Sequence, residues 1–342
     1  NDPNSTLYNN YGATNLIPGP NSTELAIEIG RDRAGWPGLA VAGACFILPA
    51  ALIVSVIAWA YVRFGQLPMS LAVLAGVKPV VIAVVVQALY RLARAAIKNV
   101  WLGALTVGAV AAAAVGIHEL IVLLAAALIS CAAALFASRE TVAEVGVLTP
   151  FLGVRAARRG VTALGVASAT PVAVSLWPLF AIFLKIGSVL FGSGYVLLAF
   201  LRADFVQRLG WLTERQLLDA VAVGQVTPGP VFTTATFIGY VLAGPLGALV
   251  ATVGIFLPAF VFVAVSGPLI PRLRRSPVAG AALDGVNAAS LALMALVTWQ
   301  LGRAALVDVP TVMLALASAA MLFTRRVNVA WLILGGGIAG AL

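Results

Sequence analysis

Long apolar runs alternate with short polar segments along most of the chain. A further apolar stretch, 171–201, is too long for one simple span and short for two, and Phe191-Gly192-Ser193-Gly194 interrupts it. Because backbone in lipid must satisfy its own hydrogen bonds, and a helical span needs ~20 apolar residues, the pattern predicts an all-α, polytopic transmembrane helix bundle. The predicted spans are 39–62, 71–90, 100–116, 119–137, 246–269, 284–302, 305–323 and 327–342.

Composition supports this class and excludes a soluble one. The 342 residues are 62% hydrophobic and only 10% charged, whereas soluble domains are about one quarter charged. The net charge is +9, but the basic residues lie between the apolar runs. They therefore indicate cytoplasmic loops, with the lipid bilayer and not nucleic acid as partner. Cys45 and Cys131 lie inside apolar runs, where we expect buried free thiols.

The two halves of the chain repeat each other. Pro18-Gly19-Pro20 recurs as Pro228-Gly229-Pro230 at an offset of 210 residues, and Phe46-Ile47-Leu48-Pro49-Ala50 matches Ile255-Phe256-Leu257-Pro258-Ala259 at 209. Lys and Arg are concentrated in opposite loops of the two halves, so the positive-inside rule gives the halves opposite orientations. The sequence thus predicts two inverted-topology repeats of about five spans each, with a Pro-Gly-Pro broken, re-entrant helix pair in each repeat.

This organisation divides the chain into four segments. We expect a polar N-terminal segment at 1–10, a first transmembrane repeat at 11–137, a basic cytoplasmic connecting loop at 138–170, and a second, inverted repeat at 171–342. The element at 185–212 has no counterpart in the first half. We therefore expect the first repeat to be N-terminally incomplete, with its first helix missing.

Each Pro-Gly-Pro must end one helix and begin another, because proline removes a backbone donor and glycine permits a reversal. The restarting helix exposes N–H groups and the positive end of its dipole, which together form an anion site. Hydroxyl and amide side chains cluster there, as a tetrahedral oxyanion requires. The alternative is a simple kink whose hydroxyls bond to their own helix. The candidate substrate-binding residues are Asn15, Pro18, Gly19, Pro20, Asn21, Ser22, Thr23, Gln225, Thr227, Pro228, Gly229, Pro230, Thr233 and Thr234.

Ionisable residues inside the apolar runs are further candidates. Lys78 costs ~3 kcal/mol to insert at mid-bilayer, so it should face the bundle interior near the substrate, with Asn287 at the equivalent position of the repeat; the alternative is a lysine that snorkels to a helix end. Glu24 is the candidate coupling residue: it would pair with Lys78, carry a proton, or simply balance the helix dipole. Lys185 precedes the secondary break at 191–194, where it would attract anions or lie at the interface.

Other chemistry is poorly represented. One histidine, His118, and two separated cysteines cannot build a zinc site, a haem site or a catalytic triad. No Walker A sequence occurs. We therefore expect no cofactor, no metal, no catalytic residue and no enzymatic activity. An intramembrane enzyme acting on a lipid phosphate and a structural scaffold remain as competing hypotheses.

Several stretches carry a family resemblance: 15–25 and 227–232 around the two Pro-Gly-Pro motifs, 46–49, 185–195, 210–213, 239–240 and 255–258. Together they resemble the chromate ion transporter (CHR) family, the ChrA-like proteins, over essentially 11–342. The resemblance implies chromate efflux across a bacterial inner membrane as an antiport coupled to the proton motive force. The implied partners are chromate or a sulfate-like oxyanion and protons, with a homodimer as a candidate assembly. Transport of another anion or small solute, such as sulfate, is the alternative.

Overall fold

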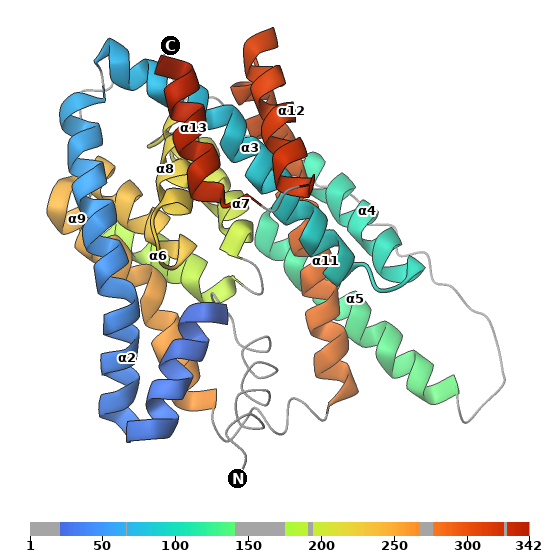
Figure 1. Ribbon diagram of the computed structural model, residues 1–342. Helices are drawn as coiled ribbons and strands as arrows, with labels where there is room; N and C mark the ends of the chain where they lie inside the picture. Colours follow the sequence, from blue (N-terminus) through green and yellow to red (C-terminus); the bar gives the residue numbers. More distant parts are fainter. Residues whose placement is uncertain are drawn as a thin grey trace.

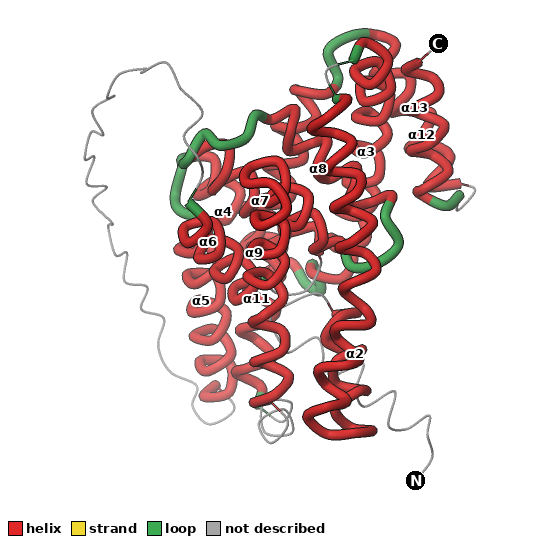
Figure 2. Tube along the Cα trace, turned by 90° about the vertical axis from the view of Figure 1, so that its left-hand side faces the viewer, coloured by secondary structure: helices red, strands yellow, loops and turns green. Residues whose placement is uncertain are grey.

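The computed structural model describes residues 21–65, 67–140, 175–190, 194–266, 276–324 and 327–341. Within these ranges every regular element is a helix, which confirms the all-α prediction (Figure 1). Where both ends of a connection lie within one described range, short loops join the helices (Figure 2). The elements are α2 (Asn21–Phe64), α3 (Pro68–Ala96), α4 (Val100–Ala114), α5 (Glu119–Glu140), α6 (Leu176–Val189), η1 (Gly194–Val196), α7 (Leu197–Leu201), η2 (Arg202–Arg208), α8 (Glu214–Val226), η3 (Val231–Thr233), α9 (Thr234–Ser266), α11 (Pro277–Ala305), α12 (Val309–Thr324) and α13 (Val329–Ala341).

Five helices in the described ranges are long and apolar enough to cross a membrane. The expected spans at 100–116, 305–323 and 327–342 are the shorter apolar helices α4, α12 and α13. The stretch 171–201 contains α6, η1 and α7 in succession. The polar segment 1–10 and most of the expected loop 138–170 lie outside the described residues. The candidate spans are Ser22–Phe64, Pro68–Ala96, Glu119–Phe136, Val231–Val265 and Pro277–Ala305.

Two glycines with positive φ reverse the chain inside α2 and α9. Gly35 has φ 62° and Gly244 has φ 66°, a backbone region that favours glycine because it has no Cβ. In α2 the two arms touch through Gly30 and Gly38, and the same contact recurs 209 residues later in α9. The expected span 39–62 is therefore only the longer arm of α2 (Figure 1).

The two halves interlock through the long helices α3 and α11, whose ends are both offset by 209 residues. α3 packs against α12 and α13 of the second half, while α11 packs against α4 and α5 of the first. Glycines permit the closest approaches. Gly76 of α3 lies against the Gly336 backbone of α13, and its equivalent Gly285 lies against the Ala126 carbonyl of α5. Each half therefore supplies the long helix on which the last two helices of the other half pack.

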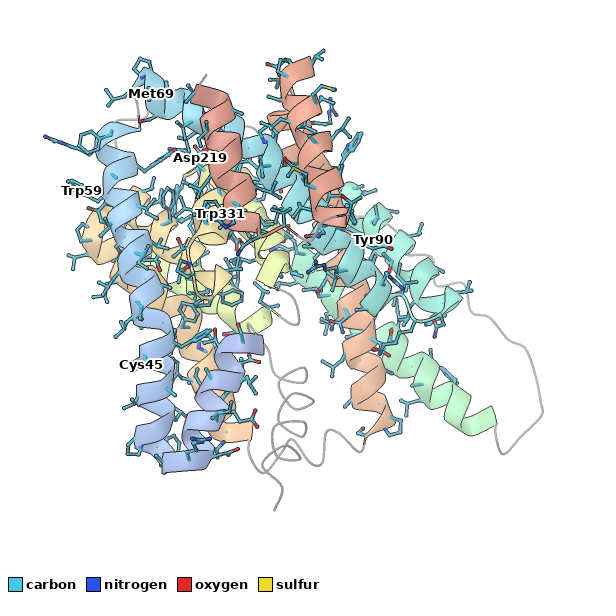
Figure 3. All side chains as sticks on the ribbon, viewed as in Figure 1. Cys45, Trp59, Met69, Tyr90, Asp219 and Trp331 are labelled. Carbon is cyan, nitrogen blue, oxygen red and sulfur yellow. The ribbon has the colours of Figure 1, made fainter. Side chains whose placement is uncertain are left out.

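The centre of the bundle is aromatic and its outer face is apolar. Many large apolar side chains are exposed, including Trp59 and Trp177, as expected for surfaces that contact lipid. Both cysteines are free, but Cys45 points outward from α2, so the expectation of a buried thiol is wrong there (Figure 3). Cys131 is half-buried. The largest fully buried rings, around α6 to α9, are Phe183, Phe200, Phe205, Phe232 and Phe237.

Candidate functional site

The second Pro-Gly-Pro separates two helices, as the sequence predicts. α8 begins with a capping box, in which Thr213 accepts from the Gln216 N–H at 3.2 Å and Gln216 accepts from the Thr213 N–H at 2.9 Å. α8 ends at Val226, and the chain becomes helical again directly after Pro230, first as η3 and then as α9. The first N–H groups and the positive end of this helix therefore face the break.

α8 and the first arm of α9 run back alongside each other. Tyr61 of α2 touches both: its hydroxyl donates to Asp219 of α8 at 3.0 Å, and its ring centroid lies 5.1 Å from that of Phe237 in α9. Along one straight helix Asp219 and Phe237 would be ~27 Å apart, so a single tyrosine could not reach both. The chain therefore reverses at Pro-Gly-Pro. We call residues 227–230 the hairpin tip.

The hairpin tip packs against α2, with Thr227 and Pro230 buried and Pro228 and Gly229 exposed. Gly229 has φ 134°, and a Cβ at this position would lie 2.5 Å from the Ala50 Cβ of α2. Next to the tip, Gly194 of η1 lies beside Val231 of η3. Two sequence motifs therefore meet here: the Leu-Pro-Ala of α2 and the end of the Phe-Gly-Ser-Gly element. Glycine is required at 229 both for its backbone conformation and for the close approach of α2.

The threonine hydroxyls around the tip donate to their own chain. This is the back-bonding that the sequence left open as an alternative to anion binding. In this conformation their protons are in use, and the Thr233 N–H also donates to the Pro230 carbonyl at 3.0 Å. The backbone N–H groups of Val231 and Phe232, at the very start of the restarting helix, are then the donors that the tip offers. The pairs are Thr227 to the Val223 carbonyl at 2.8 Å, Thr233 to the Pro230 carbonyl at 2.9 Å, and Thr234 to the Val231 carbonyl at 2.7 Å.

A small cavity adjoins the tip. Gln225, Thr234 and Gly194 are among its lining residues, and its volume is about 10 Å³, which is room for about one water. A tetrahedral anion is larger than this space. This cavity therefore does not admit a tetrahedral anion unless its walls move.

Lys78 is buried, as the sequence predicts, but its partner was missed. Its Nζ lies 3.5 Å from Oδ1 of Asp219, and the two side chains are 11% and 2% exposed. The structure thus pairs Lys78 with Asp219 and not with Glu24. Asp219 lies inside the bundle (Figure 3), where α2, α3 and α8 meet. The sequence does hold a signal for this partner, because Asp219 is the single acid within the apolar stretch 217–223 of α8.

Lys78 does not lie at the hairpin tip. Its partner Asp219 precedes Pro228 by nine residues, which is ~13 Å along α8. The structure therefore does not bring Lys78 into contact with the threonines around the tip. Asn287, its equivalent in the second half, is half-buried on α11.

Glu24 is fully buried near the start of α2. Neither of its carboxylate oxygens, nor the hydroxyl of the equally buried Thr23, has a hydrogen-bond partner within the described ranges. Glu28 lies one turn further along the helix, and Ser22 is exposed. A carboxylate in such a place is costly unless it is paired or neutral, so the position suits a group that takes up a proton.

Lys185 belongs to a separate ion-pair cluster. Its Nζ lies 2.5 Å from a carboxylate oxygen of Asp204 in the π-helical turn η2. The other carboxylate oxygen of Asp204 forms a salt bridge with Arg208 at 2.9 Å. Arg202 pairs nearby with Glu214 at the start of α8. The charge of Lys185 is therefore matched by a carboxylate away from the hairpin tip. Of the predicted site residues, Asn15, Pro18, Gly19, Pro20, Phe191, Gly192, Ser193 and the side chain of Asn21 lie outside the described part of the chain.

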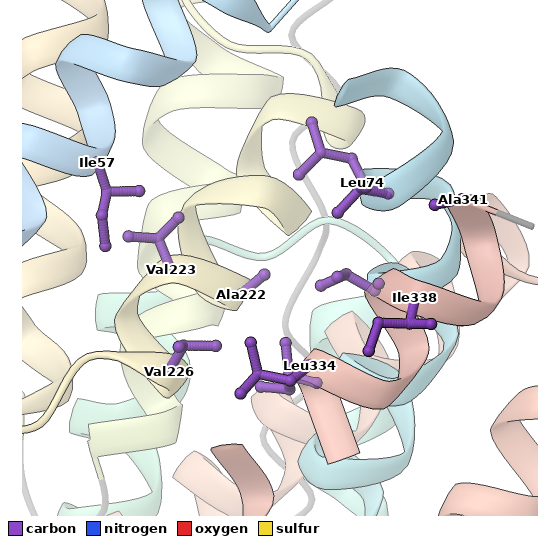
Figure 4. Close-up of a pocket in the computed structure, with 12 residues that line it drawn as sticks. Ile57, Leu74, Ala222, Val223, Val226, Leu334, Ile338 and Ala341 are labelled. Atoms are coloured by element: carbon purple, nitrogen blue, oxygen red, sulfur yellow. The ribbon is translucent and has the colours of Figure 1, made fainter. Parts of the chain in front are cut away.

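An apolar pocket of about 380 Å³ lies between α2, α3, α8 and α13 (Figure 4). Val77, which precedes Lys78, and Ala222, which follows Asp219 by nearly one turn, both line it. The residues around it, among them Ile57 and Ile338, are apolar. The pocket therefore suits hydrocarbon and not an oxyanion. It lies close to the buried ion pair of Lys78 and Asp219.

A bundle of apolar helices that encloses a broken hairpin and buried ionisable groups defines a polytopic membrane protein, with the architecture typical of a transporter. The sequence model described as "Chromate transporter" matches residues 3–131 and 177–341. The chain therefore belongs to the chromate transporter family, which confirms the resemblance carried by its motifs.

Three relatives are similar over most of their length. The chain is 32% identical over 340 residues to the chromate transport protein of Cupriavidus metallidurans, which covers 95% of this chain and 80% of that protein. It is 32% identical over 335 residues to the chromate transport protein of Pseudomonas aeruginosa, with 96% and 80% covered. It is 31% identical over 307 residues to the probable chromate transport protein of Synechococcus elongatus, with 88% and 75% covered. No solved structure matches the chain.

Proposed function

We propose that this protein is a secondary active transporter that exports chromate across the bacterial inner membrane, driven by the proton motive force. The observation that carries the proposal is the hairpin tip: a helix begins inside a membrane bundle, with its N–H groups at a break packed between α2 and η1. Family membership and the names of the relatives point to chromate as the oxyanion.

The substrate site in this proposal lies between the two Pro-Gly-Pro breaks. The helix N-terminus at the second break supplies N–H donors and a partial positive charge. The hydroxyls of Thr227, Thr233 and Thr234 join it once they release their own carbonyls. Lys78 of α3, which lies beside Asp219 of α8 and away from the tip, supplies a full charge. Sulfate has the same shape and charge as chromate, so it is expected to compete for the same groups.

Alternating access would come from the two repeats in opposite orientations, with one part of the bundle rocking against the other. The equal offset of α3 and α11, the repeated reversals in α2 and α9, and the matched glycine contacts support two equivalent units. Glu24 is the coupling candidate of the first half, because a buried carboxyl without a hydrogen-bond partner in the described ranges gains most from a proton.

Inside-out membrane vesicles that contain this protein test the proposal. Exported chromate enters such vesicles, so labelled chromate should accumulate when a proton gradient is imposed, and excess sulfate should reduce the uptake. Vesicles with the Gly229→Ala variant should show little uptake, whereas Gly335→Ala, whose added Cβ meets no atom within 4 Å, serves as the matched control. Equal uptake with and without the gradient would remove the coupling claim, and no uptake would remove chromate as substrate.

A further inference from the structure

In the second half, one side of α9 is covered by α6. The two helices cross closely at two glycines. A Cβ added at Gly254 of α9 would lie 3.0 Å from the Phe180 carbonyl oxygen and 3.1 Å from the Phe183 Cβ. A Cβ added at Gly187 of α6 would meet the Ile255 carbonyl oxygen. Because small residues let helix backbones approach and pack in lipid, α6 and this side of α9 fit each other as helix partners.

In the first half, the equivalent side of α2 is open. At an offset of 209 residues most of the surface agrees: Ile47 and Phe256 are both buried, and Leu48 and Leu257 are both exposed. One face differs. Four residues at four-residue intervals, which are neighbours along a helix face, are exposed in α2, whereas their equivalents in α9 are buried or half-buried. We call these residues of α2 the open stripe: Val41, Cys45, Pro49 and Ile53, equivalent to Val250, Gly254, Pro258 and Phe262.

The open stripe also contains a backbone carbonyl that needs cover. Pro49 has no N–H, so the Cys45 carbonyl loses the hydrogen bond that a helix would provide from position 49. Proline is tolerated in membrane helices because neighbouring helices and local adjustments satisfy or shield the freed groups. Pro258 frees the Gly254 carbonyl in the same way, and there Gly254 lies against α6. Hydrocarbon chains on the open stripe would give the Cys45 carbonyl no polar partner.

We propose that the open stripe is the docking face for a further apolar helix of the α6 kind, which lies on α2 as α6 lies on α9. The repeat supplies the template, because the covered face of α9 and the open face of α2 occupy equivalent positions. The occupant departs from α6 in one respect. It presents a small residue opposite Cys45, since α2 carries a thiol where α9 has Gly254. This inference concerns assembly of the bundle and goes beyond the proposed function, whatever the substrate.

The test is disulfide formation between the protein and a helical peptide in detergent. Cys131→Ser leaves Cys45 as the remaining thiol of the chain. The probe is a synthetic peptide of residues 175–190 with Phe183→Cys, because the Phe183 Cβ is the side-chain atom of α6 that lies nearest to position 254. A disulfide requires Cβ atoms ~3.5–4.5 Å apart, which the same docking on α2 would provide. Circular dichroism first establishes that the peptide is helical in that detergent.

Two matched controls define a specific contact. The same peptide with Ala181→Cys in place of the change at Phe183 carries its thiol on the exposed side of α6. On the protein, Cys45→Ser with Leu48→Cys moves the thiol to a position that is exposed in both halves. Under mild oxidation, the first peptide should couple to Cys45 at least about tenfold faster than in either control, because the control thiols lie outside disulfide reach.

Each other outcome overturns the inference and leaves the proposed transport function standing. Equal coupling of the two peptides, or equal coupling at positions 45 and 48, would show random collision in the micelle. The absence of coupling by helical peptides would mean that lipid alone covers the stripe. Protein dimers linked through Cys45, formed in preference to peptide adducts, would assign the stripe to a second copy of this chain.

Discussion

Lys78 of α3 and Asp219 of α8 form a buried ion pair between these two helices, with 3.5 Å between Nζ and Oδ1. α3 is one of the two long helices on which the halves interlock, whereas α8 is the first arm of the broken hairpin. The pair therefore connects the packing core of the protein to the element that carries the hairpin tip.

Removal of the lysine alone should destabilise the protein. Lys78→Met leaves the Asp219 charge buried without its partner, which costs about 3–5 kcal/mol for a buried pair. The measurement is thermal or denaturant unfolding in detergent at neutral pH. An equivalent change at the exposed pair, Lys98→Met, should cost about 1 kcal/mol or less.

The double variant separates structure from function. Lys78→Met with Asp219→Leu removes both charges and should recover most of the stability lost in the single variant, because no unpaired charge remains. It should still fail to transport chromate. A double variant that transports normally would show that the pair has only a structural role.

The hairpin tip should not tolerate a side chain at Gly229. Gly229→Ala places a Cβ on a backbone with φ 134° and against Ala50, a conformation that costs roughly 1–3 kcal/mol before the contact is counted. We expect uptake to fall more than tenfold while the protein still reaches the membrane. Chromate uptake per unit of membrane protein checks this, with Gly335→Ala as control. Uptake at the wild-type level would mean that the tip geometry is not needed.

The two glycine contacts between the halves should contribute similarly to the free energy of unfolding. Gly76→Ala and Gly285→Ala each drive a Cβ into the backbone of the other half, at Gly336 and Ala126 respectively, and overpacking of this kind costs about 1–3 kcal/mol. Unfolding of the purified variants measures the loss. Gly280→Ala is the control: its added Cβ on α11 meets no atom within 4 Å, so the variant should leave stability unchanged or raise it by up to ~1 kcal/mol. A loss at only one of the two sites would contradict equivalent packing.

Glu24→Gln tests the coupling candidate of the first half. The amide has nearly the same shape and removes a charge that has no hydrogen-bond partner in the described ranges, so the fold should be at least as stable. Accumulation driven by the proton gradient should fall several-fold, while exchange of labelled for unlabelled chromate continues. Glu119→Gln, at the start of α5, is the control. Unchanged gradient-driven accumulation would exclude Glu24 from coupling.

Much of this architecture follows from local sequence properties. Apolar runs define the helices, the capping box at Thr213 marks the start of α8, and Pro-Gly-Pro marks its end, because each depends on residues close together in the chain. The reversals at Gly35 and Gly244 were missed although Pro37 and Pro245 follow them, because one glycine with a nearby proline inside a long helix also fits a simple kink. The hydroxyl bonds around the tip were recognised only as an alternative, since a threonine sequence does not say which acceptor it meets.

The partner of Lys78 could not be read from the sequence in the same way. The contact depends on how α8 lies against α3 and α2, which is a matter of tertiary packing between segments far apart in the chain. Asp219 is an isolated acid in an apolar stretch, which indicates that its side chain faces the interior. The sequence indicates the same for Glu24, and only the structure shows which of the two acids pairs with Lys78.

Proton-driven oxyanion transport is tested most directly with the purified protein in proteoliposomes, so that no other transporter contributes. A proton gradient is imposed with equal concentrations of labelled chromate on both sides, and accumulation is followed with time. We predict accumulation against the chromate gradient that collapses with a protonophore and is reduced by sulfate. Chromate that only equilibrates, or does not cross at all, would contradict proton-driven oxyanion transport by this chain.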